Sequence, residues 1–186
     1  MASVITATTT SGLTQSADNS GVLQLASGTG NLVTVPSVTG TAMVSGNMPA
    51  FSAYASGSTN IATSTWVKMP CNTEEFDTNN NYDSTTNYRF TPTIAGYYQI
   101  NGYVELNSGS GNGFIAIYKN GSAFRYGVHA GINASNGLGM TVSTIMYFNG
   151  STDYIELYAT QNSGGTIATG SGAASVYFGG AMVRSA

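Results

Sequence analysis

Residues 96–106 constrain the fold more than any other stretch, because apolar and polar side chains alternate along them. The apolar set is Tyr98, Ile100, Val104 and Leu106. The polar set is Gln99, Asn101 and Glu105. Side chains of a β-strand point alternately to opposite sides, so this alternation predicts a strand with one face in a core. Pro92 and Gly96 precede it, as a tight entry into a strand requires.

Further strands are expected along the rest of the chain, separated by turns rich in Gly, Asn and Pro. Two of these turns contain Asn-Gly, at Asn120 and Asn149, and this pair tolerates the positive φ angles of a hairpin turn. No stretch shows a sustained 3.6-residue apolar period with caps at both ends. We therefore predict an all-β chain that forms a β-sandwich, with little or no helix.

The first part of the chain has a different composition, rich in Thr, Ser and Gly. It contains two short apolar pulses, 22–25 and 32–35, with a turn between them. Two strands this short do not form a stable domain by themselves, so they need partners. We place the boundary near Pro49, giving an N-terminal β-rich anchor or stem at 1–49 and a head at 50–186.

The head carries a family resemblance. Phe90, Gly96 and Tyr98 are spaced as in the globular head of complement C1q and its relatives. Phe76 begins an Asn-rich loop that resembles a loop of that family, and the segment around Gly180 resembles its last strand. The match runs over residues 51–183.

This resemblance implies a jelly-roll β-sandwich of the C1q/TNF type, assembled as a homotrimer and used for binding or structural work instead of catalysis. The sequence departs from the family pattern in two places. Ile100 replaces the usual aromatic residue, and Gly150 is followed by Ser-Thr-Asp where the family tends to have Gly-Asp directly.

Charge is unusually scarce: 7% of residues are Asp, Glu, Lys or Arg, against an ordinary share of about 25%. The net charge is -3 and there is no basic run, so we expect neither nucleic-acid nor membrane binding. No run of apolar residues is long enough for a transmembrane helix, and the N-terminus lacks signal-peptide features. The single cysteine, Cys71, excludes an intrachain disulfide, and we interpret it as a small apolar filler at a strand end.

We expect no enzyme and no catalytic residue. His129 is the only histidine and is interpreted as a hydrogen-bonded loop residue, not a general base. With one His and one Cys, a zinc site is also not expected. Four carboxylates, those of Glu74, Glu75, Asp77 and Asp83, surround an Asn-rich loop and offer oxygen ligands for calcium. Without an Asp-x-Asp-x-Asp-Gly pattern we interpret them as a solvated loop and predict no metal and no cofactor.

Aromatic residues make up 11% of the chain, and several fall on both faces of a predicted strand. One face can fill the core and the other needs a neighbour, since large exposed apolar faces are rare on soluble monomers. We predict trimerisation through outward-facing aromatics, with Tyr103, Tyr147 and Tyr177 as first candidates. Such an interface should be nearly indifferent to salt. Trp66, the only tryptophan, is interpreted as a packed aromatic at a strand end or subunit contact, with a sugar-stacking platform as the alternative.

The segment from Ser11 to Thr41 resembles segments near the N-termini of tailed-phage fibre and appendage proteins. We therefore expect a structural virion appendage of a tailed bacteriophage, either a capsid decoration or head fibre or a tail fibre, on the virion surface and made in the host cytoplasm. The extension would bind other virion proteins of the capsid or tail. Three loops, 107–113, 131–139 and 161–172, would contact a host surface receptor, a glycan or a protein. The alternative is a secreted C1q-like or lectin-like recognition module.

Overall fold

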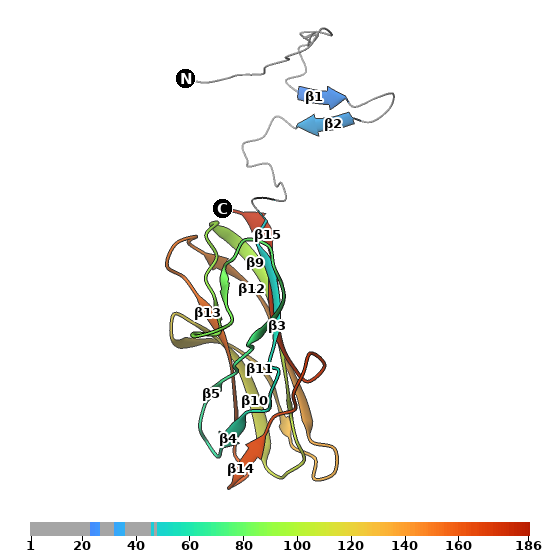
Figure 1. Cartoon of the computed structure of the whole chain (residues 1–186), viewed down its shortest axis with the longest axis vertical. Helices are drawn as coiled ribbons and strands as arrows, with labels where there is room; N and C mark the ends of the chain where they lie inside the picture. The colour runs from blue at the N-terminus through green and yellow to red at the C-terminus, as the bar shows by residue number, and fades with distance from the viewer. Residues whose placement is uncertain (1–22, 27–31, 36–45, 47) are drawn as a thin grey trace. The chain divides into compact units, whose positions relative to one another are not determined.

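The structure is a computed structural model that describes residues 23–26, 32–35, 46 and 48–186 (Figure 1). The chain divides into two units, Met1–Thr41 and Ala42–Ala186. In the first unit, β1 (Leu23–Ala26) pairs antiparallel with β2 (Leu32–Val35), so both apolar pulses form strands, as predicted. Of the rest of the predicted anchor, the structure describes residues 46, 48 and 49, whereas most of the phage-like segment and the turn at 27–31 lie outside the described residues.

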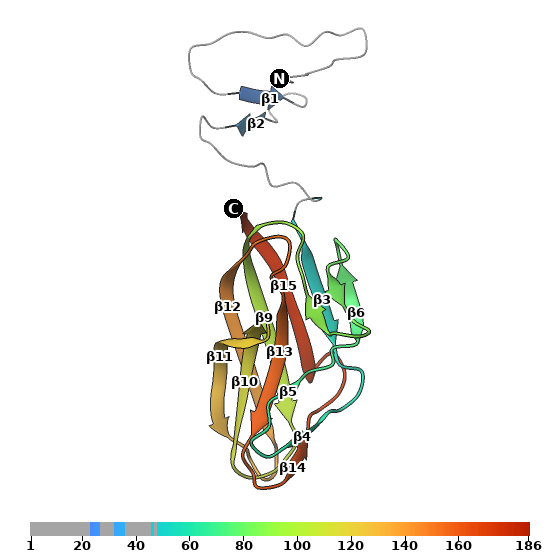
Figure 2. The same ribbon diagram turned by 90° about the vertical axis from the view of Figure 1, so that its left-hand side faces the viewer.

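The second unit is a sandwich of two antiparallel sheets, and Figure 2 shows the sheets face-on with their strands spread across the view. The first sheet has the order β12-β9-β15-β3-β6. These strands are β12 (Leu138–Phe148), β9 (Gly96–Leu106), β15 (Val176–Ser185), β3 (Ala50–Tyr54) and β6 (Thr73–Asp77). β3, the first strand of the sandwich, begins directly after Pro49, the predicted boundary.

The second sheet has the order β11-β10-β13-β8-β7, and β5 also pairs with β13. These strands are β11 (Ser122–Gly131), β10 (Asn112–Lys119), β13 (Ile155–Gln161), β8 (Arg89–Phe90), β7 (Tyr82–Asp83) and β5 (Val67–Lys68). A separate ribbon joins β4 (Asn60–Ala62) to β14 (Thr166–Ala168). The fold is therefore the all-β sandwich that the sequence predicts.

β9 lies in the middle of the first sheet, between β12 and β15. The predicted alternation is confirmed. Tyr98, Ile100, Val104 and Leu106 are fully buried. The outer surface is reached, to different degrees, by Gln99, Asn101, Tyr103 and Glu105. The geometry of a strand explains this burial pattern, because successive side chains point to opposite faces and only every second one can reach the core.

Aromatic rings from both sheets meet in the core. The Phe51 ring stacks on Phe90 with centroids 4.2 Å apart and meets the edge of Phe178 at 5.1 Å. Phe90 in turn contacts the edges of Tyr98 and Phe148. Stacked and edge-to-face pairs of this kind add to the burial energy of each ring, so this cluster is a main source of stability.

Two turns at the start of β11 and β13 are tied together by one carboxylate. Asn120 and Gly121 both have positive φ, 52° and 79°, which confirms the predicted hairpin turn. Asp153 accepts hydrogen bonds from the Asn120 side chain at 2.8 Å and the Asn149 backbone N–H at 3.0 Å. It also pairs with Lys119 at 2.9 Å. Charged hydrogen bonds of this kind fix the two turns relative to one another.

β3 begins and β15 ends at the same end of the sandwich. Ala181 lies opposite Ala50, and the Met182 N–H donates to the Pro49 carbonyl at 3.0 Å. The ribbon of β4 and β14 lies at the opposite end, as Figure 1 shows. The two ends of the sandwich are therefore structurally distinct.

Two predictions about loops were wrong. His129 lies in β11 and not in a loop, and its ring stacks on Phe114 with centroids 3.9 Å apart. The polar loop expected at 161–172 begins with the last residue of β13 and contains β14. Gln161 itself is buried, and its side-chain amide donates hydrogen bonds to the Ile61 and Gly165 carbonyls. A buried polar side chain of this kind is tolerated when it is hydrogen-bonded.

Among the described residues, none forms a helix long and apolar enough to span a bilayer.

Candidate subunit interface

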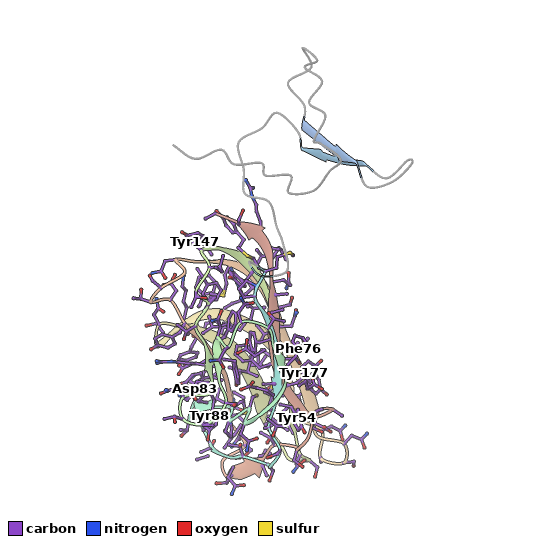
Figure 3. All side chains as sticks on the ribbon, turned by 45° about the horizontal axis from the view of Figure 1, so that its top comes forward. Tyr54, Phe76, Asp83, Tyr88, Tyr147 and Tyr177 are labelled. Atoms are coloured by element: carbon purple, nitrogen blue, oxygen red, sulfur yellow. The ribbon has the colours of Figure 1, made fainter. Side chains whose placement is uncertain are left out.

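The outer surface of the five-stranded sheet carries a set of aromatic side chains, which we call the aromatic face. The strand register places them in rows across the sheet. Tyr147 on β12 lies opposite Tyr97 on β9. Further along, Tyr103 on β9 lies opposite Tyr177 on β15, and Tyr177 lies opposite Tyr54 on β3. Figure 3 labels Tyr147, Tyr177 and Tyr54 on the sandwich.

The tyrosines form close pairs that still present much of their surface to solvent. The Tyr97 and Tyr147 rings meet edge to face at 5.5 Å, and each residue is 43% exposed. The Tyr103 and Tyr177 rings stack at 5.3 Å. Partial burial, followed by the nearby Glu105 and Tyr177, raises the pKa of Tyr103 above its ordinary value. The Tyr103 hydroxyl therefore stays neutral at physiological pH.

Between the two tyrosine pairs the face is polar but uncharged. The Gln99 amide donates to the Ser143 hydroxyl at 2.8 Å, and that hydroxyl donates to Asn101 at 3.0 Å. A hollow of about 320 Å³ lies beside this group, lined by Phe76, Tyr177 and other residues. Gly179, which has no side chain, contributes part of its lining.

Isolated apolar residues are normal on a protein surface, but a contiguous face is not. Phe76, Ile145, Tyr177 and Val183 are exposed on this side of the sheet to 51%, 58%, 38% and 52%. Together with the neutral hydrogen-bonded centre, they make a surface suited to a protein partner: large side chains around polar groups that are already satisfied.

The predicted interface residues Tyr103, Tyr147 and Tyr177 all lie on the aromatic face. Tyr147 belongs to one pair, and Tyr103 and Tyr177 form the other. Sequence reasoning missed Tyr97 and Ile145 as members of this face. Part of the signal was present, because Tyr97 lies between two buried residues and Ile145 precedes the buried Met146. Assigning them needed the register of β9 against β12, which the sequence does not state.

The residues on which the C1q resemblance is based occupy three kinds of position. Phe90 and Tyr98 are buried in the core. Gly96 and Gly180 stand where a side chain would collide with neighbours: a Cβ at Gly96 would meet the Arg184 carbonyl, and one at Gly180 would lie 2.5 Å from Ile100. Phe76 is on β6 and borders the hollow of the aromatic face. The signature thus reports mainly packing.

Two of the acidic residues around the Asn-rich loop, Asp83 and Asp77, act as local turn caps. Asp83 accepts backbone N–H groups of Thr85 and Thr86, and these bonds with that from the Asn87 side chain hold its pKa well below the usual range. Asp77 accepts the Tyr82 N–H at 2.7 Å. In the described part of the chain, no group of three or more His, Cys, Asp or Glu side chains is arranged to hold a metal ion.

The three segments predicted to contact a receptor come together at one end of the sandwich. Gly111 accepts the Ile132 N–H at 2.8 Å, and Asn112 exchanges hydrogen bonds with Asn162. The Asn107 N–H also donates to the Ala168 carbonyl, which is a second contact between the first and third segments. These segments lie at the end that carries β4 and β14, away from the start of β3.

Comparison with solved structures identifies this fold. Murine APRIL at pH 5.0 is similar with a TM-score of 0.58 and 6% identity over 73% of this chain and 99% of that chain. The Eiger TNF from S. frugiperda gives 0.55 and 7%, over 75% of this chain and 93% of that chain. The globular domain of zebrafish complement 1qA gives 0.53 and 15%, over 74% and 98%.

No protein-family model matches the sequence, and no curated protein matches it. At identities this low, the structural likeness shows the fold alone. The sandwich is therefore a jelly roll of the C1q/TNF type, as the sequence resemblance implies.

Proposed function

We propose that this chain is the subunit of a homotrimeric virion appendage of a tailed bacteriophage, with a structural or recognition role and no catalytic activity. The observation that carries the proposal is the aromatic face. A soluble chain with only 7% charged residues and such a face needs a partner to cover it. Obligate interfaces bury about 2,000 Å² or more, which requires much of one sheet.

A cyclic assembly accounts for the shape of the aromatic face. The exposed Tyr97 and Tyr147 pair lies in one row, and the hollow beside Phe76 and Tyr177 lies elsewhere on the same sheet. Unlike features on one surface suit a head-to-tail contact, in which each copy presents one feature to the next and the ring closes. The resemblance to C1q heads implies that three copies close it.

The N-terminal extension and the loop end supply the other two parts of the proposal. The extension, which resembles segments of phage appendage proteins, would attach the trimer to capsid or tail. The three segments at the opposite end of the sandwich would face outward and contact a host receptor. Detection of the chain in purified phage particles by mass spectrometry tests this role. Its presence only in particle-free medium would favour a secreted recognition module.

Sedimentation equilibrium tests the assembly. We expect three times the subunit mass in dilute buffer, at low and at high NaCl, because the aromatic face holds few screenable charges. Tyr97→Ser with Tyr147→Ser should lower the mass toward one subunit. Phe124→Ser is the matched control, since Phe124 is 42% exposed on β11 of the other sheet. A folded wild-type monomer would contradict the trimer.

A further inference from the structure

The outer surface of the second sheet carries a separate group of aromatic residues, which we call the Trp66 groove. It consists of two adjoining hollows that share Trp66 and Phe114. The first, of about 380 Å³, is also lined by Tyr126 and His129. The second, of about 290 Å³, is also lined by Thr160. Ligand sites of small molecules commonly have about 300–1,000 Å³, so the combined groove has a suitable size.

Strand register explains why a groove forms here. Phe114 on β10 lies opposite Thr160 on β13 and His129 on β11, which makes one row across the sheet. In the next row Ala116 lies between Tyr158 and Tyr126. Ala116 is fully buried and lines neither hollow, so the row of Phe114 is the one that borders the groove.

The rings that border the hollows are fixed by one another. Trp66 lies 5.8 Å from Tyr126 and 6.0 Å from Tyr118, measured between ring centroids. The Phe114 and His129 rings stack at 3.9 Å. Tyr126 is nevertheless 63% exposed, the largest fraction among the exposed large apolar residues that the structure describes. The groove thus presents ordered ring faces to solvent.

One polar group in the groove lacks a partner. Thr160 is 7% exposed, and its hydroxyl oxygen is buried without a hydrogen bond. It is the only buried side-chain polar atom of this kind among the described residues. Leaving a buried hydroxyl unpaired costs about 1–3 kcal/mol, and such an exception calls for an explanation. Thr160 lines the second hollow, so a small shift of its side chain would bring the hydroxyl to a ligand there and supply the missing bond.

The other polar groups of the second hollow are uncharged side chains. Ser64 and Asn162 line the second hollow, and the Asn162 side-chain oxygen already accepts the Asn112 N–H at 2.6 Å. Among the described residues, no Lys, Arg, Asp or Glu lines either hollow. A charged ligand would find no Lys, Arg, Asp or Glu side chain to pair with there, which favours a neutral polar ligand.

We propose that the Trp66 groove binds a neutral carbohydrate. A pyranose ring has an apolar face of C–H groups and a rim of hydroxyls. The C–H face fits against the electron-rich faces of Trp66 and Tyr126, while the hydroxyl rim can donate to and accept from Thr160 and Asn162. This inference deepens the proposed host contact by naming its ligand class and the surface that binds it, beside the loop end of the head.

Trp66 is the only tryptophan of the chain, so its fluorescence reports on the groove directly. The full-length protein is first quenched with acrylamide, and we expect Trp66 to be accessible. It is then screened on an array of neutral oligosaccharides, and the best of them is titrated by fluorescence and by calorimetry. We expect saturable binding to at least one oligosaccharide.

Two substitutions locate the site. Tyr126→Ala should weaken binding about tenfold or more, which corresponds to the loss of one stacking surface worth about 1.4 kcal/mol. Thr160→Val, which keeps the shape but removes the hydroxyl, should weaken it about fivefold. Phe124→Ala, on the same strand as Tyr126 but outside the groove, should leave binding unchanged. Circular dichroism and sedimentation of each variant confirm that fold and assembly are intact.

Three outcomes would overturn the proposal. They are the absence of binding to any neutral oligosaccharide, equal binding by Tyr126→Ala and wild type, and shielding of Trp66 from acrylamide that is relieved by dilution. The last would show that a second copy of the chain covers the groove. None of them depends on particles, so failure of the groove is distinguishable from failure of the appendage role.

Discussion

Replacing Phe90 by Ala tests the aromatic core directly. The Phe90 ring is fully buried, stacks on Phe51 at 4.2 Å, and meets the edges of Tyr98 and Phe148 at 5.8 and 6.1 Å. Both sheets contribute to these contacts, so the surroundings cannot close around the lost ring without moving a sheet. We therefore expect a loss of about 3–5 kcal/mol, the range found for Phe→Ala in a core.

Urea unfolding, followed by circular dichroism, measures this loss. The variants are compared at equal protein concentration, because assembly makes apparent stability depend on concentration. Phe124→Ala is the control and should change stability by about 0.5 kcal/mol or less, since Phe124 is exposed. The double variant with Phe51→Ala should lose less than the sum of the two single losses, by about 0.5–1.5 kcal/mol for the shared ring pair.

The result that refutes this reasoning is a loss for Phe90→Ala below about 1 kcal/mol, or one equal to that of the control. Either would mean that the ring cluster is not a main source of stability.

Three further predictions concern a carboxylate, a glycine and a thiol. Burial by itself would raise the pKa of Asp153, but its hydrogen bonds hold the pKa below the ordinary value. The stability that the Asp153 carboxylate contributes is therefore present above about pH 4 and is lost as pH falls through the lowered pKa. Asp153→Asn should cost about 1.5–3 kcal/mol at pH 7 and flatten the acid side of the stability curve, and an unchanged acid side would contradict this. Gly180→Ala places a Cβ 2.5 Å from Ile100 and should lower the free energy of unfolding in urea by about 1–3 kcal/mol. The control Gly165→Ala, whose Cβ would have no atom within 4 Å, should be nearly neutral. Equal effects of the two variants would show that the structure around Gly180 relaxes. Burial raises the pKa of Cys71 to about 12, so the native thiol should not react with a disulfide reagent at pH 8 but should react fully in urea, and rapid reaction of the native protein would contradict its burial.

The parts of the fold that could be predicted from the sequence are those set by local patterns. The alternation in β9 and the Asn-Gly turn at Asn120 are properties of neighbouring residues, so periodicity and turn chemistry identify them. Cys71 is fully buried, as its interpretation as an apolar filler requires. Asn149 also behaves as predicted for a turn residue, because its side-chain oxygen accepts backbone N–H groups of Ser151 and Thr152.

The parts that could not be predicted depend on contacts between distant segments. β4 and β14 have only three residues each, too few to show a period, and they form because Ile61 lies opposite Ile167. His129 was assigned to a loop because glycines surround it, but pairing with Phe114 extends β11 through that position. The candidate surfaces differ in the same way. The outward tyrosines of the aromatic face could be predicted from the sequence, whereas the Trp66 groove depends on the register of β10 with β11 and β13.

The neighbouring positions of the start of β3 and the end of β15 decide how the head can be engineered. β15 ends beside the start of β3, so a peptide fused after Ala186 would be held at the base of the head, next to the entering chain. Gly164 and Gly165 lie at the other end, where a Cβ on either would have no atom within 4 Å. An epitope inserted between these two glycines would be displayed at the tip, the arrangement needed for an antigen carrier.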